Sequence, residues 1–138
     1  MGSGCGCSDL RCKPWNDNDM KLIIAGGRDF SDRLLLKKEV EAFINEQSVS
    51  LSDVEVVSGF AKGADTLGEA WGFVSGVKVK IFPPDWNRHG KAAGPIRNRE
   101  MAEYATHCIV FWDGKSRGAK SMIEEANKYE LTTKVISY

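Results

Sequence analysis

No stretch of the sequence stays apolar over the roughly 20 residues that a transmembrane helix needs, and no apolar signal segment opens it. Lys and Arg together number 19, as do Asp and Glu, so the formal net charge is zero. General nucleic-acid binders rely on an excess of cations that face phosphates. We therefore expect neither a membrane nor a nucleic-acid partner, although a local basic pocket is compatible with this balance.

Cysteine is scarce, and its placement argues against a disulfide framework. Three of the four cysteines, Cys5, Cys7 and Cys12, lie in the first dozen residues, and Cys108 lies in an apolar run. A closed zinc site needs four ligands, and no histidine is near the first three, so we expect no metal and no cofactor. A reducing cytoplasm is the expected compartment. Residues 1–20 lack any periodicity and are expected to form a flexible tail before one folded domain at 21–138.

Short apolar runs alternate with helical patterns along the rest of the chain. Strands are expected at 21–25, 54–57, 77–82, 107–112 and 133–137, and helices at 33–47, 64–75, 95–105 and 118–130. This alternation predicts an α/β fold, a three-layer Rossmann-like parallel sheet of about five strands with helices on both faces. With the first strand in the centre, the expected strand order is 3-2-1-4-5, and the strand-to-helix loops meet at one edge.

Two of these loops carry glycines. After the first strand, Gly26, Gly27 and Arg28 combine room for close backbone approach with a guanidinium that can clamp a phosphate. After the second, the loop offers an anion-binding turn rather than an ATPase loop, because the Walker spacing is missing; its candidates are Ser58, Gly59, Lys62 and Gly63. Asp65 follows in the first helical turn, where it either stabilises the helix or accepts hydrogen bonds from ribose hydroxyls.

The stretch from Gly90 to Met101 gathers glycines, a proline and cations at a helix entrance. Lys91 and Arg97 are the best phosphate candidates, with Gly94 beside them, whereas Arg99 should face solvent. Asn98 can bond to a loop or a base, and Trp86 upstream can stack on a base or cover the sheet edge. After the fourth strand, the last loop adds further ligand candidates: Asp113, Ser116, Arg117 and Gly118.

The residues of these loop motifs, and their order along the chain, resemble those of a known family. Gly-Gly-Arg-Asp-Phe from 26, Ser-Gly-x-Ala-Lys-Gly-Ala-Asp from 58, His-Gly-Lys-Ala-Ala-Gly-Pro-Ile-Arg-Asn from 89 and Phe-Trp-Asp-Gly-x-Ser-Arg-Gly from 111 are similar to the YspA/YpsA-related branch of the SLOG superfamily. The resemblance spans about residues 21–138. It implies a pocket for a nucleotide or a nucleotide-derived molecule in a bacterial or phage protein, and by analogy a homodimer.

Two departures from the family pattern bear on activity. Phe60 stands where the second loop usually has glycine, and its side chain is expected to narrow or cover the pocket. Lonely Guy phosphoribohydrolases of the same superfamily use an arginine and a glutamate; Arg97 resembles the arginine, but Met122 occupies the glutamate position. The leading expectation is a sensor or sequestering module. The alternative is a phosphoribohydrolase-like N-glycosidase or nucleotide hydrolase, with Arg97, Asp113 and Glu124 as catalytic candidates.

Overall fold

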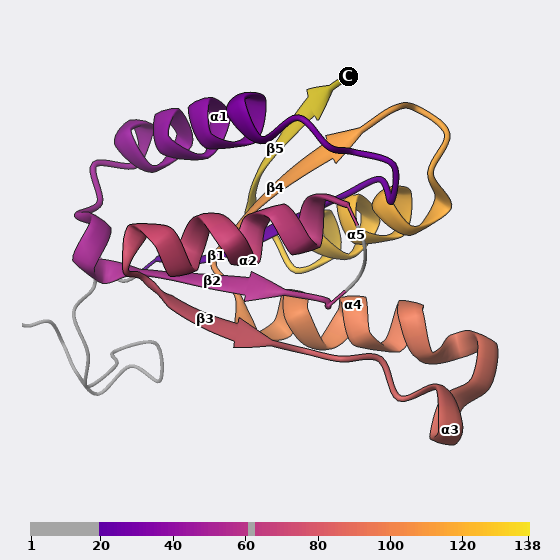
Figure 1. Cartoon of the computed structure of the whole chain (residues 1–138). Coiled ribbons are helices and arrows are strands. Elements are labelled where there is room, and N and C mark those ends of the chain that lie inside the picture. The colour runs from indigo at the N-terminus through magenta and orange to yellow at the C-terminus, as the bar shows by residue number, and fades with distance from the viewer. Residues whose placement is uncertain (1–19, 61–62) are drawn as a thin grey trace, which may run out of the picture.

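The computed structural model describes residues 20–60 and 63–138, so the expected tail with Cys5, Cys7 and Cys12 lies outside it, as does Lys62. Five strands alternate with helices along the chain (Figure 1). The strands are β1 (Met20–Gly26), β2 (Val54–Ser58), β3 (Lys78–Ile81), β4 (His107–Trp112) and β5 (Thr132–Ser137). The α-helices are α1 (Arg33–Glu46), α2 (Ala64–Ser75), α3 (Trp86–His89), α4 (Ala93–Tyr104) and α5 (Arg117–Lys128), with 3-10 turns η1 (Leu51–Asp53) and η2 (Gly90–Ala92).

The strands form one parallel sheet in the order β3-β2-β1-β4-β5, which confirms the expected order and the α/β class. The register aligns Ile23 of β1 with Val57 on one side and with Cys108 on the other. Strand order reverses between β1 and β4, because the chain leaves β1 toward β2 and returns to β4. The carboxyl ends of these two strands are therefore the place where such sheets bind ligands.

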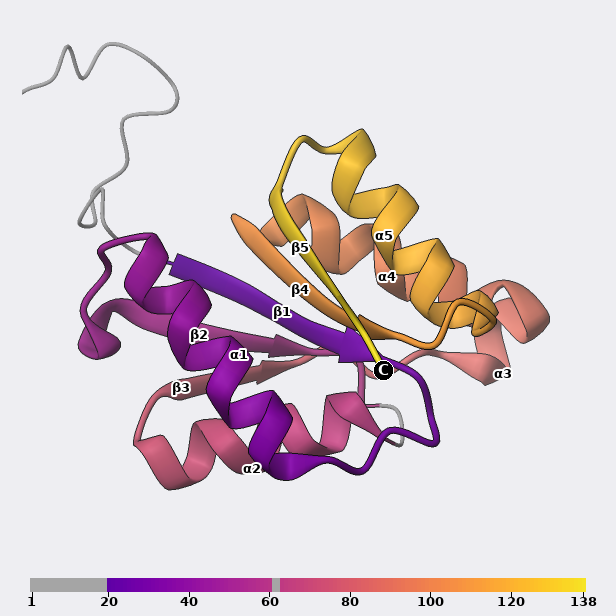
Figure 2. The ribbon, with the colours of Figure 1, turned by 90° about the horizontal axis from the view of Figure 1, so that it is seen from above.

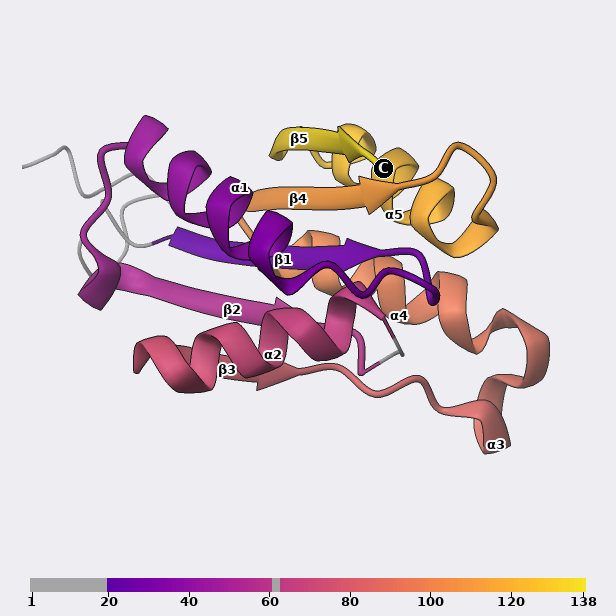
Figure 3. The same cartoon turned by 45° about the horizontal axis from the view of Figure 1, so that its top comes forward.

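Helices cover both faces of the sheet, with α1 and α2 on one side and α4 and α5 on the other (Figures 2 and 3). Alternate residues of β1 supply the two cores, as the period of a strand requires. Leu22 and Ile24 are fully buried beneath α1 and α2. Ile23 and Ala25 point to the opposite face, where they pack with buried residues of α4 and α5.

Helix α2 packs on the sheet through its two glycines, as expected. A Cβ atom on Gly68 would lie 2.7 Å from Ile24, and one on Gly72 would lie 2.7 Å from Val79. Helical spacing with Leu67, Ala70 and Trp71 would by itself place Val74 on the inner face, but its side chain is 88% exposed. The glycine face takes the sheet contact and turns Val74 toward solvent.

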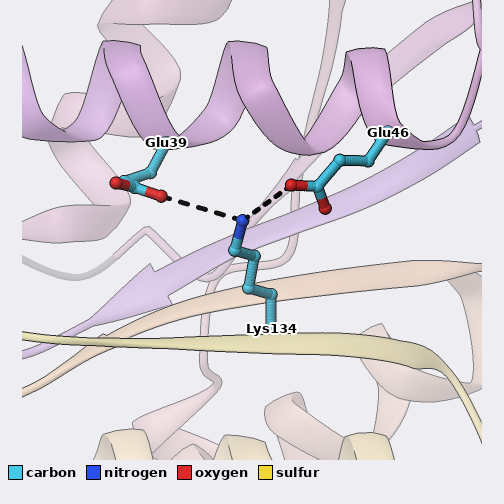
Figure 4. A network of polar contacts seen from close by, with 3 residues as sticks. All are labelled: Glu39, Glu46 and Lys134. Carbon is cyan, nitrogen blue, oxygen red and sulfur yellow. Dashed lines mark hydrogen bonds and ion pairs between the residues drawn. The ribbon is translucent and has the colours of Figure 1, made fainter.

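The edge strand β5 is tied to α1 by a small ionic network (Figure 4). The Nζ of Lys134 lies 3.1 Å from Glu46 and 3.8 Å from Glu39. Exposed pairs of this kind are worth well under about 1 kcal/mol each. The network orients α1 against the sheet and lies among partly exposed side chains.

The segment between β3 and α4 was expected to be a loop, but it contains the short helix α3. The Oδ1 of Asp85 accepts a hydrogen bond from the amide of Arg88 at 3.1 Å and so caps the helix. Asp85 before Trp86 is an ordinary N-cap signal. The four residues of this helix are too few and too polar to show apolar periodicity. The sequence pattern therefore did not predict α3.

Candidate nucleotide-binding cleft

The carboxyl edge of the sheet holds a cleft made of two adjoining cavities, of about 450 and 460 Å³. Each lies within the range of about 300–1,000 Å³ that is usual for small-molecule sites. Both cavities share one wall, formed by Arg28, Arg97, Asn98, Arg117 and Gly118. We call the first cavity, which contains Phe60, Pro84, Trp86, Gly94 and Pro95, the aromatic lobe. The second, which contains Asp29, Asp65 and Asp113, is the acidic lobe.

Arg97 on α4 is the best-anchored cation of the cleft. One Nη1 proton is donated to the carbonyl oxygen of Gly59, and Nε donates to Oδ1 of Asn98 at 2.8 Å. Burial lowers the pKa of the guanidinium; the nearby carboxylate of Asp65 opposes this shift, and the charge of Arg28 adds to it. A guanidinium has five N–H donors, so three remain for a ligand after these two bonds.

Arg28 and Arg117 reach the same wall from the loop after β1 and from the first residue of α5. Within residues 20–60 and 63–138, neither side chain makes a hydrogen bond or an ion pair. Three arginines thus converge on one place, and two of them are unpaired there. An anion between them would gain charge-assisted, bidentate hydrogen bonds.

The loop between β4 and α5 is organised by Asp113 and Ser116. Oδ1 of Asp113 accepts from the amides of Lys115 at 2.8 Å and Ser116 at 2.9 Å, and these bonds lower the pKa of the carboxyl. Ser116 caps α5 by accepting from the amide of Ala119 at 3.3 Å, as expected. The ionised Asp113 therefore holds the loop that presents the helix N-terminus.

Asn98 joins α4 to the first turn of α5. Its Nδ2 donates to the carbonyl of Gly118 at 3.5 Å and to Oγ of Ser121 at 3.3 Å, while its Oδ1 accepts from Arg97. The side chain is buried, at 5% exposure. Asn98 was expected to bond to a loop or to a base. In the structure its side chain bonds to the start of α5.

Ser58, which was expected to contact the ligand, lies outside the described lining of both lobes. The residue is fully buried, and Oγ donates to Oε2 of Glu69 at 2.5 Å. The same oxygen accepts from the amide of Phe60 at 3.2 Å. These two hydrogen bonds of the hydroxyl stabilise the turn after β2. The sequence around Ser58 does not indicate that Glu69 is its partner.

The glycines after β1 and β2 pack against protein atoms. The amide of Gly27 donates to Phe111 at 3.0 Å, and that of Gly59 donates to Oδ2 of Asp65 at 3.1 Å. Both of these amides are therefore already bonded within the protein. A Cβ on Gly63, whose φ is +82°, would lie 2.1 Å from the carbonyl oxygen of Gly27, so the two loops touch.

Trp86 and Phe60 both line the aromatic lobe, as expected, and both are largely exposed. Gly94 lies beside the indole, since a Cβ there would be 3.8 Å from the ring of Trp86. Lys91 was expected to bind a phosphate. In the structure it is exposed on η2 and lies outside the lining that the described residues form. Phe60 has φ of +59°, which explains why glycine suits this position.

Of the catalytic candidates, Arg97 and Asp113 lie in the cleft and Glu124 does not. Glu124 is exposed on α5 and is absent from the described lining of either lobe. Met122 is buried and lines the acidic lobe. The residue that the resemblance aligns with the phosphoribohydrolase glutamate is thus a buried thioether.

Sequence reasoning missed Asp29 as a cleft residue. Its Oδ1 accepts a hydrogen bond from the hydroxyl of Tyr138 at 2.7 Å, and the ring of Tyr138 packs edge-on against Phe30. Burial and this carboxylate raise the pKa of Tyr138. The position of Asp29 directly after Arg28 was the available signal; the 109-residue separation from Tyr138 gave none.

Among the residues that the structure describes, no three His, Cys, Asp or Glu side chains come together as a metal site. In the same part of the chain, none of the helices has the length and apolar character needed to span a bilayer.

Three comparisons relate this chain to known proteins. The model of the YspA, cpYpsA-related SLOG family matches residues 20–89, from β1 through α3. The Gene 61 protein of Mycobacterium phage D29 is 34% identical over an alignment of 116 residues, which covers 78% of this chain and 89% of that protein. DNA processing protein A from Streptococcus pneumoniae has a similar structure, with a TM-score of 0.68 and 18% identity over 87% of this chain. The chain spans half the length of that structure, and the likeness establishes the fold.

Proposed function

Because the chain belongs to the YspA, cpYpsA-related SLOG family, we propose that its cleft binds a nucleotide or a nucleotide-derived ligand, as a sensor or sequestering module. The observation that carries the proposal is the convergence of Arg28, Arg97 and Arg117 on one wall. Three guanidiniums in a concave site at the strand-order switch are suited to a phosphate.

Two helix N-termini support the same assignment. Gly94 and Pro95 lie in the first turn of α4, and Arg117 and Gly118 lie in the first turn of α5; all four line the cleft. The first amides of a helix lack acceptors within the helix, and the helix dipole favours an anion there. A Cβ on Gly118 would meet nothing within 4 Å, so this is the glycine whose backbone is open to a ligand.

The two lobes suit the other parts of a nucleotide. A base would stack on Trp86 or Phe60 in the aromatic lobe, as bases do on exposed aromatic rings. In a nucleotide-derived ligand that continues beyond its phosphate, hydroxyl groups of that further part would donate to the carboxylates of Asp29, Asp65 and Asp113 in the acidic lobe.

The geometry supports binding over the N-glycosidase alternative. The position that the resemblance assigns to the catalytic glutamate of the phosphoribohydrolases carries Met122, which lines the acidic lobe and cannot transfer a proton. Asp113, with its lowered pKa, is unsuited to donate a proton at neutral pH. We further propose that the protein acts in the cytoplasm of a bacterium or a phage-infected cell and forms a homodimer, which light scattering can test.

The binding proposal is tested by calorimetric titration with AMP, GMP, CMP and UMP, and with a labelled single-stranded oligonucleotide in parallel. Saturable mononucleotide binding is expected. Removing a charge-assisted hydrogen bond costs about 1.5–3 kcal/mol, so Arg117→Ala should weaken binding about 10- to 100-fold. The matched control is Arg99→Ala on the exposed face of α4, which should bind like the unmodified protein.

The same samples are assayed for free base. Binding without base release supports a sensor or sequestering module. Base release that Arg97→Ala abolishes would show that the protein is an enzyme. Binding of the oligonucleotide without binding of any mononucleotide would show that the cleft is a nucleic-acid site. If none of the probes binds, the nucleotide proposal fails.

A further inference from the structure

The arginines lie between the two lobes rather than at the end of either. Arg28, Arg97 and Arg117 line both cavities, whereas Phe60 and Trp86 line only the first and Asp29 and Asp113 only the second, among the residues described. Any anion that these guanidiniums hold must therefore lie at the junction. Its two sides open into lobes of nearly equal size, about 450 and 460 Å³.

The lobes also differ in charge. The described lining of the aromatic lobe contains three arginines and no carboxylate, which gives it a local charge of +3. The acidic lobe adds Asp29, Asp65 and Asp113 to the same arginines, which brings its formal charge to zero. The first lobe suits a planar base next to an anion, and the second suits a neutral group rich in hydroxyls that donate to carboxylates.

A nucleoside monophosphate matches only half of this arrangement. Its phosphate is at one end, so with the base in the aromatic lobe and the phosphate on the arginines, the acidic lobe would hold only water. A ligand that fills both lobes carries its anion in the middle. Diphosphate linkages are the common anionic bridges between a nucleoside and a second sugar, and three guanidiniums provide enough donors for two phosphate groups.

We propose that the cleft selects nucleoside diphosphate sugars, with the base in the aromatic lobe, the diphosphate on the three arginines and the second sugar in the acidic lobe. This inference rests on the proposed nucleotide binding and deepens it. Asp29 is the specificity residue for the second sugar. Its Oδ1 is occupied by Tyr138, and its Oδ2 makes no hydrogen bond within residues 20–60 and 63–138.

The test is a calorimetric series at constant base: AMP, ADP and ADP-ribose, repeated with UMP, UDP and UDP-glucose. For at least one base, the diphosphate sugar is expected to bind at least 10-fold more tightly than the monophosphate. Asp29→Asn keeps the acceptor for Tyr138 and removes the charge. It should weaken binding of the diphosphate sugar about 2- to 10-fold, the worth of one hydrogen bond, and leave the monophosphate unaffected. Glu100→Gln, exposed on α4, is the matched control.

The outcomes separate the two proposals. If monophosphates bind as tightly as diphosphate sugars, or if Asp29→Asn weakens both equally, the diphosphate-sugar proposal is overturned and nucleotide binding stands. If no nucleotide of the series binds, both proposals fail. Circular dichroism and melting of Asp29→Asn confirm that a weaker affinity reflects the site and not unfolding.

Discussion

Gly26 at the end of β1 and Gly118 in the first turn of α5 line the same cleft, but a side chain would meet very different surroundings at the two positions. A Cβ on Gly26 would lie 2.4 Å from the carbonyl oxygen of Phe111 and 2.8 Å from Cβ of Ala64. A Cβ on Gly118 would meet no atom within 4 Å. One glycine is required by neighbouring protein, and the other leaves its place open.

The difference extends to the loops as a whole. The glycine loops after β1 and β2 contact each other, and their amides at Gly27 and Gly59 bond within the protein. They form the scaffold that places Arg28 and receives Arg97. The first turns of α4 and α5 also line the cleft, through Gly94, Pro95 and Gly118. Glycine-rich sequence near a sheet edge therefore marks close packing as readily as it marks a phosphate site.

The largest effect on the stability of the protein is expected from Gly26→Ala. Its methyl group would be forced against backbone, which cannot move without disturbing the β1–β4 pairing. Overpacking costs about 1–3 kcal/mol or more, and we expect the free energy of unfolding in urea to fall by about 3 kcal/mol. Gly118→Ala, measured alongside, should leave stability unchanged or raise it by up to about 1 kcal/mol, because alanine is the better helix former. Equal losses in both variants would contradict the comparison.

A double-mutant cycle between Gly27 and Tyr138 should show an intermediate effect. A Cβ on Gly27 would lie 2.1 Å from the hydroxyl of Tyr138, the tip of a side chain rather than backbone. Gly27→Ala should cost about 1–2 kcal/mol in the natural background and clearly less with Tyr138→Phe. We expect a coupling energy of about 0.5–1.5 kcal/mol from the four urea transitions. Strictly additive losses would show that the hydroxyl is not the obstacle.

The smallest effect on the free energy of unfolding is expected from replacing Phe60, and this substitution should raise stability rather than lower it. Its φ of +59° strains a non-glycine residue by about 1–2 kcal/mol, and the side chain is 62% exposed, so little burial is lost on removing it. Phe60→Gly should raise the free energy of unfolding by about 0.5–1 kcal/mol, net of the added freedom of the unfolded chain. It should also weaken nucleotide binding if the ring stacks on the base. A less stable variant would remove the evidence for strain at this turn.

The fold was largely readable from the sequence, because five apolar runs alternating with helical patterns admit few topologies. The strand order was predicted from this alternation with the first strand in the centre. The site was readable only in part. Arg28, Arg97 and Arg117 lie in the cleft as expected, because each lies in a loop or near the start of a helix at the carboxyl edge.

The errors share one physical cause, which is that the sequence does not show long-range partners. Ser58 bonds to Glu69 on the next helix, and Asn98 reaches the carbonyl of Gly118. Lys91 carries the right charge, but the short helices before α4 leave it exposed outside the cleft. Val74 fits a helical stripe, but the paired glycines of α2 set which face meets the sheet.

A crystal structure of the protein soaked with a nucleotide that binds in calorimetry tests the central claim most directly. The account predicts phosphate oxygens within hydrogen-bonding distance of the guanidiniums of Arg28, Arg97 and Arg117, with the base against Trp86 or Phe60. A nucleotide bound elsewhere, such as in the apolar groove between α1 and α2 around Leu67 and Trp71, would contradict it.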